Sequence, residues 1–589
     1  MSTIVKLVPY DGDKQFCEII INGGKFYDVL AIIKDLPVRD YVKEIRCWII
    51  PHKDIMILIK QLKAINVEVK INAVVKNKYL EYLNWKSEQI LIKTSKYDYT
   101  KYENEVNSDK RLYPFQVLGS FFLYKSGDGL LCDMVGLGKS VQSLTAVGKH
   151  FSDKSINFCI IICPSTLKKN WEQEIKKWSN KTSFVVTGDK NNRRKQYKAA
   201  YKYDYMIINY EMLNFDMQLI HDYILSKGYE YALIVDEIQY IKNHLAKRSE
   251  NTKTISYFAK YSIGMSATAI ENSLMDLWSV FQAIDVTVFG SKKLFWHFKD
   301  KFIKVDWFGN PIGYKDEETI KKRMSPYLIR RLKEDVLNDL PDRIENNFWV
   351  ELSPIQRKFY DEVSSQVTTS ITDMEKAEKI KYAEILPMIT YLRQCVLSAK
   401  LVGHSENIST KTTQLLEFLE SVDDKSKIVC FTHFVGMVEL LKETLDTYKI
   451  KNMCIHGKTG SPLFCPVNNR VATIDIFNND PSCKILVCSD ILTEGVNITS
   501  ANYLLNFDLL FNPAKMEQRV GRIDRIGQKH ESINIINFIA SDTIDDDIYE
   551  KVISKQKIST DIMDNKRIES RISFNDIKSM FELNKKKIK

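Results

Sequence analysis

Short continuous runs of apolar residues limit most strongly what this chain can fold into. Clear examples are residues 158–163, 232–235, 427–431 and 484–488, and stretches with a helical pattern separate them. A run without polar alternation is typical of a parallel strand that is buried on both faces of its sheet. Strands that alternate with helices in this way predict an α/β architecture.

The apolar runs fall into two groups, which predict two parallel-sheet lobes. The stretch between the groups is more charged and shows no clear strand pattern, so we expect a helical insertion there. Residues at the start of the chain form a separate block, which we expect to be a small α/β domain. The expected parts are an N-terminal domain with linker (1–100), lobe 1 (101–285), the insertion (286–404), lobe 2 (405–540) and a C-terminal helical brace with a basic tail (541–589).

The composition excludes several classes of protein. With 589 residues, 44% of them hydrophobic, the chain can build several buried cores and is not a disordered protein. No run of about 18 apolar residues is present, so no membrane partner is expected. The first residues lack an apolar signal core and the 11 cysteines are scattered, so we expect a soluble intracellular protein with reduced thiols. The net charge of +10 permits a polyanionic partner without requiring one.

A glycine-rich segment, DMVGLGKS, begins at Asp133. Glycines in such a loop allow backbone amides to point at phosphate oxygens, and a helix that starts next adds its N-terminal dipole. The lysine would reach the β- and γ-phosphates and the serine would coordinate Mg²⁺. The strict phosphate-loop pattern has glycine where this chain has Asp133. The expected nucleotide contacts are Gly136, Leu137, Gly138, Lys139 and Ser140.

An acidic pair, Asp236 and Glu237, directly follows the apolar run 232–235. Carboxylates at the end of a buried strand suit a phosphoryl-transfer site, where Asp236 would hold Mg²⁺ and Glu237 would polarise the attacking water. The alternative is an ordinary surface turn at the end of a strand. The pair favours a nucleotide site because it follows the glycine-rich segment.

Two arginines near the end of lobe 2, Arg522 and Arg525, are spaced so that they would share one face of a helix. Guanidinium groups stabilise the charge on a transferred phosphoryl group, which in other nucleotide hydrolases is worth about 10³–10⁵ in rate. The alternative is a pair of surface arginines bound to Asp524 or Glu517. If Lys139 and Arg522 act on one nucleotide, they come from different lobes, as in a motor whose cleft closes on ATP.

Taken in order, these segments resemble the superfamily-two helicases, and specifically the Swi/Snf-type DNA translocases, over residues 108–556. The resemblance implies two RecA-like lobes, ATP and Mg²⁺ as cofactors, and Gln116 as the contact to adenine. It also implies phosphate contacts along the nucleic acid from Ser165, Asn170, Asn209, His456 and Thr493. The motifs that carry it are LYPFQ at 112, CPSTL at 163, NYE at 209, SAT at 266, IRRLK at 329 and QRVGRIDRIGQ at 518.

Some positions depart from the family pattern. The sequence Asp-Glu-Ile-Gln, ending at Gln239, stands where the family has Asp-Glu-Ala-His, and Gln239 is expected to replace the histidine as the hydrogen-bonding group of the catalytic cleft. The residues 492–494, Leu-Thr-Glu, replace a glycine pair. This version is similar to a bacterial and phage-like branch that includes an ATPase recycling RNA polymerase.

The N-terminal block resembles the HARP-type domain of annealing helicases, which pairs a proline–arginine turn with an arginine–tryptophan strand. The matching segments are IKDLPVRDY from Ile33 and RCWIIP from Arg46. Arg39, Arg46 and Trp48 would form a basic aromatic platform for a DNA fork or a single strand. The alternative is that Trp48 belongs to the core of a small α/β domain.

The function expected from these features is ATP-dependent translocation on double-stranded DNA that remodels or reanneals it without processive strand separation. Duplex or forked DNA is the expected partner, and a replication, repair or transcription protein is a further candidate. Three alternatives remain open: an ATPase that remodels RNA or RNA polymerase, the motor subunit of a restriction system, and a non-catalytic nucleic-acid-binding scaffold. The joint presence of Lys139, Glu237 and Arg522 argues against the scaffold.

Overall fold

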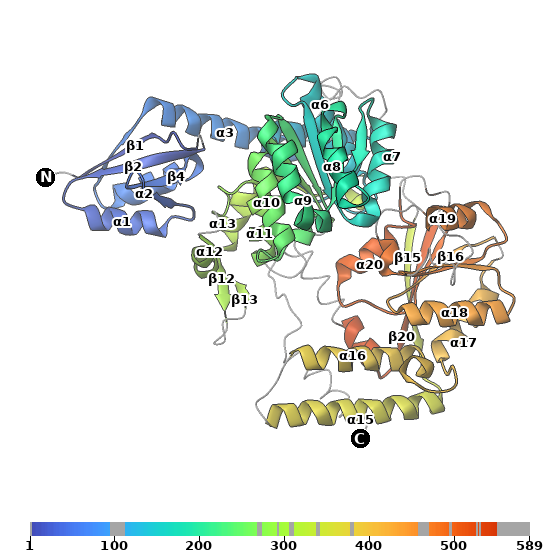
Figure 1. The fold of residues 1–589 in the computed structure, drawn as a ribbon. Coiled ribbons are helices and arrows are strands. Elements are labelled where there is room, and N and C mark those ends of the chain that lie inside the picture. Colours follow the sequence, from blue (N-terminus) through green and yellow to red (C-terminus); the bar gives the residue numbers. More distant parts are fainter. Residues whose placement is uncertain are drawn as a thin grey trace. The chain divides into compact units, whose positions relative to one another are not determined.

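The computed structural model of the chain is shown in Figure 1. It describes residues 3–13, 15–94, 112–267, 274–290, 294–305, 311–336, 342–376, 382–423, 425–457, 470–493, 498–525, 528, 530 and 532–550. The chain forms two compact units, Met1–Met134 with Gly138–Val336 and Val135–Leu137 with Leu337–Lys589. Unit 1 holds the N-terminal domain with lobe 1, except for three residues of the glycine-rich segment, and unit 2 holds those residues with lobe 2. Within the described ranges, no helix is long and apolar enough to cross a lipid bilayer.

The N-terminal domain is a five-stranded mixed sheet in the order β3-β4-β2-β1-β5. Only the pair β1–β5 is parallel. Its core is built from apolar residues of the strands and of the helices that pack on them, which confirms the small α/β domain. The elements are β1 (Ile4–Pro9), β2 (Phe16–Asn22), α1 (Phe26–Asp35), β3 (Asp40–Val42), β4 (Cys47–Pro51), α2 (Ile55–Ala64) and β5 (Glu68–Ile71).

Lobe 1 is a seven-stranded sheet, all parallel, in the order β14-β6-β11-β10-β7-β9-β8. The predicted apolar runs 158–163 and 232–235 lie in β7 and β10, and both strands are buried along their whole length. The strands are β6 (Gly129–Leu131), β7 (Phe158–Cys163), β8 (Ser183–Val185), β9 (Tyr205–Asn209), β10 (Tyr231–Asp236), β11 (Tyr261–Met265) and β14 (Leu328–Ile329). The helices are α5 (Pro114–Ser126), α6 (Lys139–Ser152), α7 (Lys168–Trp178), α8 (Lys190–Lys198), α9 (Tyr210–Tyr223), α10 (Lys247–Phe258) and α11 (Leu274–Ile284).

Lobe 2 is a six-stranded parallel sheet in the order β15-β20-β19-β16-β18-β17. The apolar runs 427–431 and 484–488 correspond to β16 and β18, so the prediction of two parallel-sheet lobes is confirmed. Its strands are β15 (Asp342–Val350), β16 (Ile428–Thr432), β17 (Asn452–Ile455), β18 (Ile485–Ser489), β19 (Tyr503–Asn506) and β20 (Ser532–Ala540). Its helices include α17 (Thr410–Ser421), α18 (Val435–Thr447), α19 (Arg470–Asn479) and α20 (Pro513–Val520).

The range 286–404 differs from the expected helical insertion because it contains strands as well as helices. Helices α12 (Phe295–Phe302) and α13 (Glu317–Met324) flank the hairpin β12 (Ile303–Val305) and β13 (Pro311–Tyr314). Farther along the chain, β14 joins the sheet of lobe 1 and β15 joins that of lobe 2. The remaining helices, α15 (Pro354–Lys376) and α16 (Tyr382–Leu397), share a core with residues of lobe 2. The range is therefore divided between the two units.

The C-terminal end of lobe 2 is fixed by a buried ion pair. Residues 544–550 are helical, and the ammonium of Lys411 lies 2.5 Å from a carboxylate oxygen of Asp545. The same ammonium donates to the carbonyls of Phe507 and Phe538, at 3.0 and 2.9 Å. The described start of the expected brace, 541–550, is thus part of unit 2, and the basic tail lies outside the described residues.

A long helix, α3 (Ala73–Thr94), joins the N-terminal domain to lobe 1. Its Val75 belongs to the core of the N-terminal domain, and its Ile92 belongs to the core of lobe 1. Buried charges cross the same junction, because Arg323 of α13 forms an ion pair with Asp54. The expected linker after this helix, up to residue 110, lies outside the described residues. We conclude that the N-terminal domain is fixed on lobe 1 by packing and by buried charge.

Removing one partner of the Arg323–Asp54 pair should therefore weaken unit 1 strongly. Arg323→Ala leaves a fully buried carboxylate without its cation, which costs about 3–5 kcal/mol in comparable buried pairs. The matched control is Lys322→Ala, which removes an exposed pair with Glu318 and should cost less than about 1 kcal/mol. Urea unfolding of the two variants measures the difference. Equal losses would show that the junction does not depend on this pair.

Candidate nucleotide site and arginine segment

The glycine-rich segment connects β6 to α6, and α6 begins at Lys139 as predicted. Gly136 and Gly138 both have positive φ angles, 91° and 74°, a region that favours glycine. A Cβ atom on Gly138 would also lie only 2.5 Å from the side-chain nitrogen of Gln116. The chain therefore needs glycine at residue 138 for its backbone angle and for the close approach of Gln116.

Asp133, which departs from the strict phosphate-loop pattern, is fully buried and acts as an anchor for the loop. Its two carboxylate oxygens accept from the guanidinium of Arg331, with N–O distances of 3.0 and 2.5 Å. Gln142 of α6 donates to the same carboxylate at 3.1 Å, and Arg331 donates to the Gln142 side-chain oxygen at 2.6 Å. A two-pronged ion pair of this kind fixes both the position and the orientation of the carboxylate. The carboxylate thus holds the start of the loop against α6 and β14.

Lys139 lies in the first turn of α6, where its ammonium faces the inside of the loop. The ammonium donates to the carbonyls of Asp133 and Met134, at 2.8 and 3.4 Å. Burial lowers the pKa of Lys139, although the nearby carboxylates of Glu237, Asp133 and Asp236 act in the opposite direction. The ammonium is therefore bound to the loop and lies close enough to the acidic pair at the end of β10 to feel its charge.

The acidic pair lies at the carboxyl end of β10, as predicted. Asp236 ends the strand and is 9% exposed, and Glu237 follows with a left-handed φ of 49°. One carboxylate oxygen of Asp236 accepts from the backbone amide of Glu237 at 2.9 Å, and the other from the indole nitrogen of Trp171 at 2.8 Å. The strained turn directs the two carboxylates to different neighbours.

Trp171 is a site residue whose contact the sequence analysis did not anticipate. It lies in the segment expected to follow a nucleic-acid strand, yet its side chain is 1% exposed. Its helix, α7, follows β7, and β7 lies next to β10 in the sheet. This adjacency lets the indole nitrogen donate to Asp236 at the end of β10. A buried tryptophan generally finds a partner for its N–H, which offered a signal, but the sequence alone does not say which acceptor it meets.

A short chain of hydrogen bonds connects Glu237 to the end of β11. The side-chain nitrogen of Gln239 donates to Glu237 at 2.6 Å, and the hydroxyl of Ser266 donates to the Gln239 side-chain oxygen at 2.7 Å. An amide can do both because it carries a donor and an acceptor. Gln239 therefore links the proposed base to the motif at Ser266. The next motif residues, 268–273, lie outside the described residues.

The charges at this site fit a magnesium nucleotide. Burial and the neighbouring Glu237 raise the pKa of Asp236 to about 7, while Trp171 and Lys139 lower it. A divalent cation beside Asp236 would oppose this rise, because it stabilises the ionised carboxylate. The glycines at 136 and 138, together with Lys139 and Ser140 in the first turn of α6, supply the loop and helix N-terminus that a phosphate group requires.

The arginine segment differs from the expected helix. Helix α20 ends at Val520, and residues 521–525 form turns. Arg522 is 3% exposed, and its Nε donates to the carbonyl of Gln518 at 3.0 Å. Arg525 is half-buried, and its Nε donates to the carbonyl of Gly521 at 2.6 Å. Each side-chain Nε donates to the backbone carbonyl four residues earlier, and α20 ends before both arginines, so a shared helix face is not the reason for their spacing.

Glu517, one of the two alternative partners expected for these arginines, pairs with a different arginine. Glu517 forms a two-pronged ion pair with Arg343 of β15, at 2.9 and 3.1 Å. Gly521 donates its backbone amide to the carbonyl of Glu517 at 2.8 Å. The carboxylate of Glu517 is thus engaged by an arginine of the neighbouring edge strand, and it supports α20 from outside.

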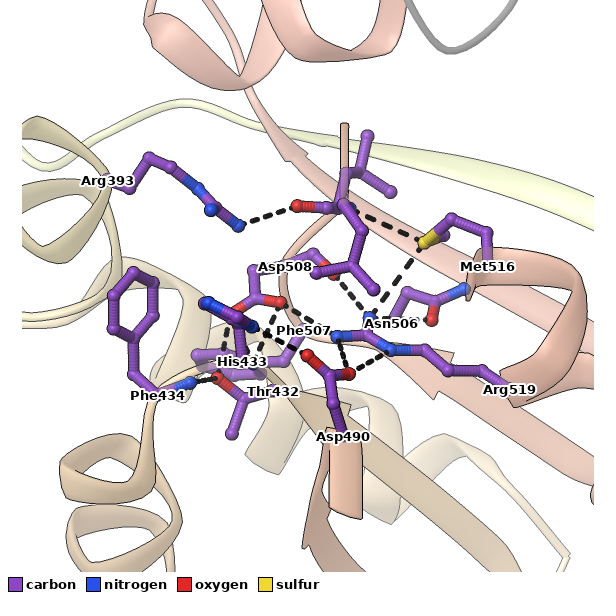
Figure 2. A network of polar contacts seen from close by, with 12 residues as sticks. Arg393, Thr432, His433, Phe434, Asp490, Asn506, Phe507, Asp508, Met516 and Arg519 are labelled. Atoms are coloured by element: carbon purple, nitrogen blue, oxygen red, sulfur yellow. Dashed lines mark hydrogen bonds and ion pairs between the residues drawn. The ribbon is translucent and has the colours of Figure 1, made fainter. Parts of the chain in front are cut away.

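A further arginine, Arg519, lies at the centre of a polar network in lobe 2 that the sequence analysis did not single out (Figure 2). It is fully buried and forms ion pairs with Asp490 at 2.7 Å and with Asp508 at 3.2 Å. Burial alone would raise the pKa of Asp490, but Arg519 and His433 lower it to about 2. The backbone amide of His433 donates to Asp508 at 2.8 Å. Arg519 therefore fixes the end of α20 to the ends of β16, β18 and β19.

The residues expected to contact nucleic-acid phosphates differ in accessibility. Ser165, after β7, is exposed, and Asn170 in α7 is half-buried. Asn209 is 4% exposed and donates to Glu211, while its own side-chain oxygen has no hydrogen-bond donor among the described residues. His456 is 1% exposed. Thr493 ends a short 3₁₀ helix, Asp490–Thr493, and its side chain lies outside the described set.

The platform expected in the N-terminal domain involves β3 and β4. Arg46 is exposed in the turn between them, and Trp48 is half-buried with its ring centroid 5.3 Å from that of Tyr41. Trp48 also packs against the domain core. Arg39 turns inward and donates to the carbonyl of Leu36 at 3.2 Å. Of the three residues expected to form the platform, only Arg46 is exposed, while Trp48 is half-buried and Arg39 turns inward.

The role assigned to Asp133 gives a prediction that runs against the consensus pattern. Asp133→Gly creates the strict phosphate-loop sequence, yet it leaves Arg331 buried without its carboxylate, so nucleotide binding should weaken by at least about tenfold. Titration with a fluorescent ATP analogue measures the affinity. Asp153→Gly, at the far end of α6, removes a pair with Lys149 and a hydrogen bond from Tyr124, both distant from the glycine-rich loop, and should bind as the unaltered chain does. Equal or tighter binding by Asp133→Gly would contradict the anchor role.

Several known proteins are similar to this chain in sequence. The chain is 28% identical over 433 residues to an uncharacterized ATP-dependent helicase of Mycoplasma pneumoniae, covering 73% of this chain and 40% of that protein. It is 23% identical over 479 residues to the ISWI chromatin-remodeling complex ATPase ISW1 of Saccharomyces cerevisiae, covering 76% of this chain and 40% of that protein. The chain thus spans about 40% of the length of these curated relatives.

Among solved structures, the Sulfolobus solfataricus SWI2/SNF2 ATPase core in complex with dsDNA matches with 27% identity and a TM-score of 0.37, covering 78% of this chain and 94% of that one. Two family models match in succession, the SNF2-related domain over residues 60–401 and the helicase conserved C-terminal domain over residues 410–527. The chain therefore belongs to the SNF2-related family, with a helicase conserved C-terminal domain in its second lobe.

Proposed function

We propose that this protein hydrolyses ATP, with Mg²⁺, to move along double-stranded DNA and remodel or reanneal it. The observation that carries the proposal is the position of Lys139 between the glycine loop and the carboxylates of Asp236 and Glu237. These groups lie at the carboxyl ends of neighbouring parallel strands, β6 and β10, with only β11 between them. This edge is where open α/β sheets bind their ligands.

The chain offers a distinct residue for each part of a magnesium nucleotide. The amides around Gly136, Leu137 and Gly138 would hold phosphate oxygens, and Lys139 would neutralise their charge. Ser140 and Asp236 would hold the metal ion, and Gln116, packed against Gly138, would contact the base. When bound, the magnesium nucleotide supplies the phosphoryl group that is transferred to water.

Glu237 would take the proton of the attacking water, because it is the second carboxylate of the pair and is oriented by Gln239. The same chain of hydrogen bonds leads to Ser266, so a change in the charge of the Glu237 carboxylate would alter the hydrogen bonding at the end of β11. In lobe 2, Arg522 and Arg525 are the candidates that stabilise charge on the transferred group. Closure of a cleft on the nucleotide would bring the two arginines to the nucleotide, and release of the nucleotide would open the cleft.

Double-stranded DNA is the proposed substrate for three reasons. The chain carries a net charge of +10. One relative is a chromatin-remodeling complex ATPase, and one matched structure is a SWI2/SNF2 core in complex with dsDNA. The exposed Ser165 and the half-buried Asn170 would contact phosphates, which carry no sequence information, whereas the buried Asn209 and His456 would need a local rearrangement to do so. Thr493 remains a candidate from the resemblance. In the N-terminal domain, the exposed Arg46 and the half-buried Trp48 would add recognition of forks or single strands.

ATP hydrolysis measured across nucleic acids tests the substrate. We expect no more than weak hydrolysis without nucleic acid, strong stimulation by duplex DNA, and further stimulation by a fork. The charge-reversing variant Arg46→Glu should remove the preference for forks and leave duplex stimulation intact. Stimulation by RNA or by RNA polymerase, with none by DNA, would instead identify the remodeller of transcription considered in the sequence analysis.

Three variants test the assigned chemistry. Glu237→Gln keeps the shape and hydrogen bonding of the side chain but not its basicity, so hydrolysis should fall by about 10²–10⁴ while ATP still binds. Arg522→Ala should also spare binding and lose about 10³-fold or more in rate. Lys139→Ala should lose binding itself. Rates near that of the unaltered protein in Glu237→Gln would remove this carboxylate from the mechanism.

A further inference from the structure

Three asparagines form a row across the sheet of lobe 2. Asn347 of β15, Asn537 of β20 and Asn506 of β19 are paired in register on three adjacent parallel strands. The side chain of Asn506 donates to that of Asn537 at 2.8 Å, and Asn537 donates to Asn347 at 2.9 Å. A side-chain amide is both donor and acceptor, so such a row can continue from strand to strand. We call these three residues the asparagine ladder.

The inner end of the ladder reaches Arg519. The guanidinium of Arg519 donates to the side-chain oxygen of Asn506 at 3.1 Å, which Figure 2 shows from close by. Its central carbon also lies 5.4 Å from the ring centroid of Phe431, the residue of β16 that pairs in register with Asn506. The row of side chains across the sheet therefore ends on the arginine that fixes the last turn of α20.

The outer end of the ladder reaches the C-terminal segment. Asn347 donates to the hydroxyl of Tyr549 at 2.7 Å, and Asn537 also donates to Glu345 at 3.1 Å. Asn347 is exposed, Asn537 is 3% exposed and Asn506 is fully buried. The ladder thus runs from the surface of the edge strand to the interior of lobe 2. Each buried amide loses its partner if a neighbour is removed, which makes the row act as a unit.

We propose that the asparagine ladder positions the arginine segment, so that Asn537 and Asn506 are positioning residues for Arg522 and Arg525. They act through Arg519, because neither asparagine forms a direct hydrogen bond to the turn 521–525 in the described set. Arg519 immediately precedes Val520, where α20 ends and the turn begins. The kinetic part of this inference rests on the proposed ATPase function, whereas the structural part stands without it.

The competing explanation is that the asparagines only join neighbouring strands. Backbone ladders already join β15, β20 and β19 along their lengths, so the side chains are not required for pairing. Buried amides in a parallel sheet are also costly unless they are fully paired. Their connection to a buried guanidinium favours a positioning role over simple strand adhesion.

Hydrogen exchange of the full-length protein tests the structural part. Asn537→Leu removes the middle of the ladder, and a cavity of about 230 Å³ lined by Asn537 and Asn506 gives the new side chain room. We expect deuterium uptake in the peptide covering 513–525 to accelerate about 2- to 30-fold, the range seen for coupling through such networks. Asn534→Leu, half-buried on the opposite face of the same strand, is the matched control and should leave this peptide unchanged.

The kinetic readout uses the same variants. Asn537→Leu should lower kcat for ATP by a similar factor at an unchanged KM, because Lys139 and Ser140, which are assigned to nucleotide binding, lie in α6 of lobe 1. In a double-mutant cycle with Arg519→Lys, the two losses should be less than additive. Unchanged exchange at 513–525, or equal acceleration in Asn534→Leu, would overturn the proposal. If the unaltered protein hydrolyses no ATP, the proposed function fails, and the exchange result still decides on the ladder.

Discussion

In each lobe, an arginine pairs with one or two carboxylates beside the segment that carries candidate site residues; Asp133 and Asp508 are buried and Asp490 is half-buried. In lobe 1, Arg331 holds Asp133 at the start of the glycine-rich loop. In lobe 2, Arg519 holds Asp490 and Asp508 below the turn that carries Arg522. Burying such charges is costly, and breaking one partner away costs more, so the loops cannot shift without leaving a charge unpaired. The fold thereby fixes the backbone of each loop before any ligand arrives.

The parallel sheets explain why the remaining groups gather where they do. In lobe 1, the carboxyl ends of adjacent strands supply the glycine loop, the acidic pair and Ser266. Helix α7, which follows β7, contributes Trp171 to the same edge. The carboxyl ends of β16, β18 and β19 similarly supply Thr432, Asp490 and Asp508 in lobe 2. One edge of each sheet therefore carries its chemistry, and the other edges and faces supply stability.

The sequence could predict the elements whose signal is local. The apolar runs at β7, β10, β16 and β18 marked buried parallel strands, and the glycine loop marked the start of α6 at Lys139. The sequence did not predict strand β15 because its residues 343–349 are exposed on an edge of the sheet, where a continuous apolar run is not required. The helical spacing of Arg522 and Arg525 was misleading, since two residues in successive turns can have the same spacing.

Long-range partners were beyond the reach of the sequence. Asp133 looked like a defect in a consensus because Arg331 lies 198 residues away. Trp171 looked like part of a nucleic-acid segment, and only the adjacency of β7 and β10 reveals that it donates to Asp236. The asparagine ladder depends on register between strands that no spacing along the chain encodes. Such contacts are set by topology, so they emerge only with the fold.

The central claim is that the loop at Lys139 and the turn at Arg522 act on the same nucleotide. The most direct measurement is an experimental structure of the protein with ADP–aluminium fluoride, Mg²⁺ and duplex DNA. The account predicts that the ammonium of Lys139 and the guanidinium of Arg522 both contact the fluoride group. A complex in which Arg522 keeps to its own lobe, distant from a bound nucleotide analogue, would contradict it.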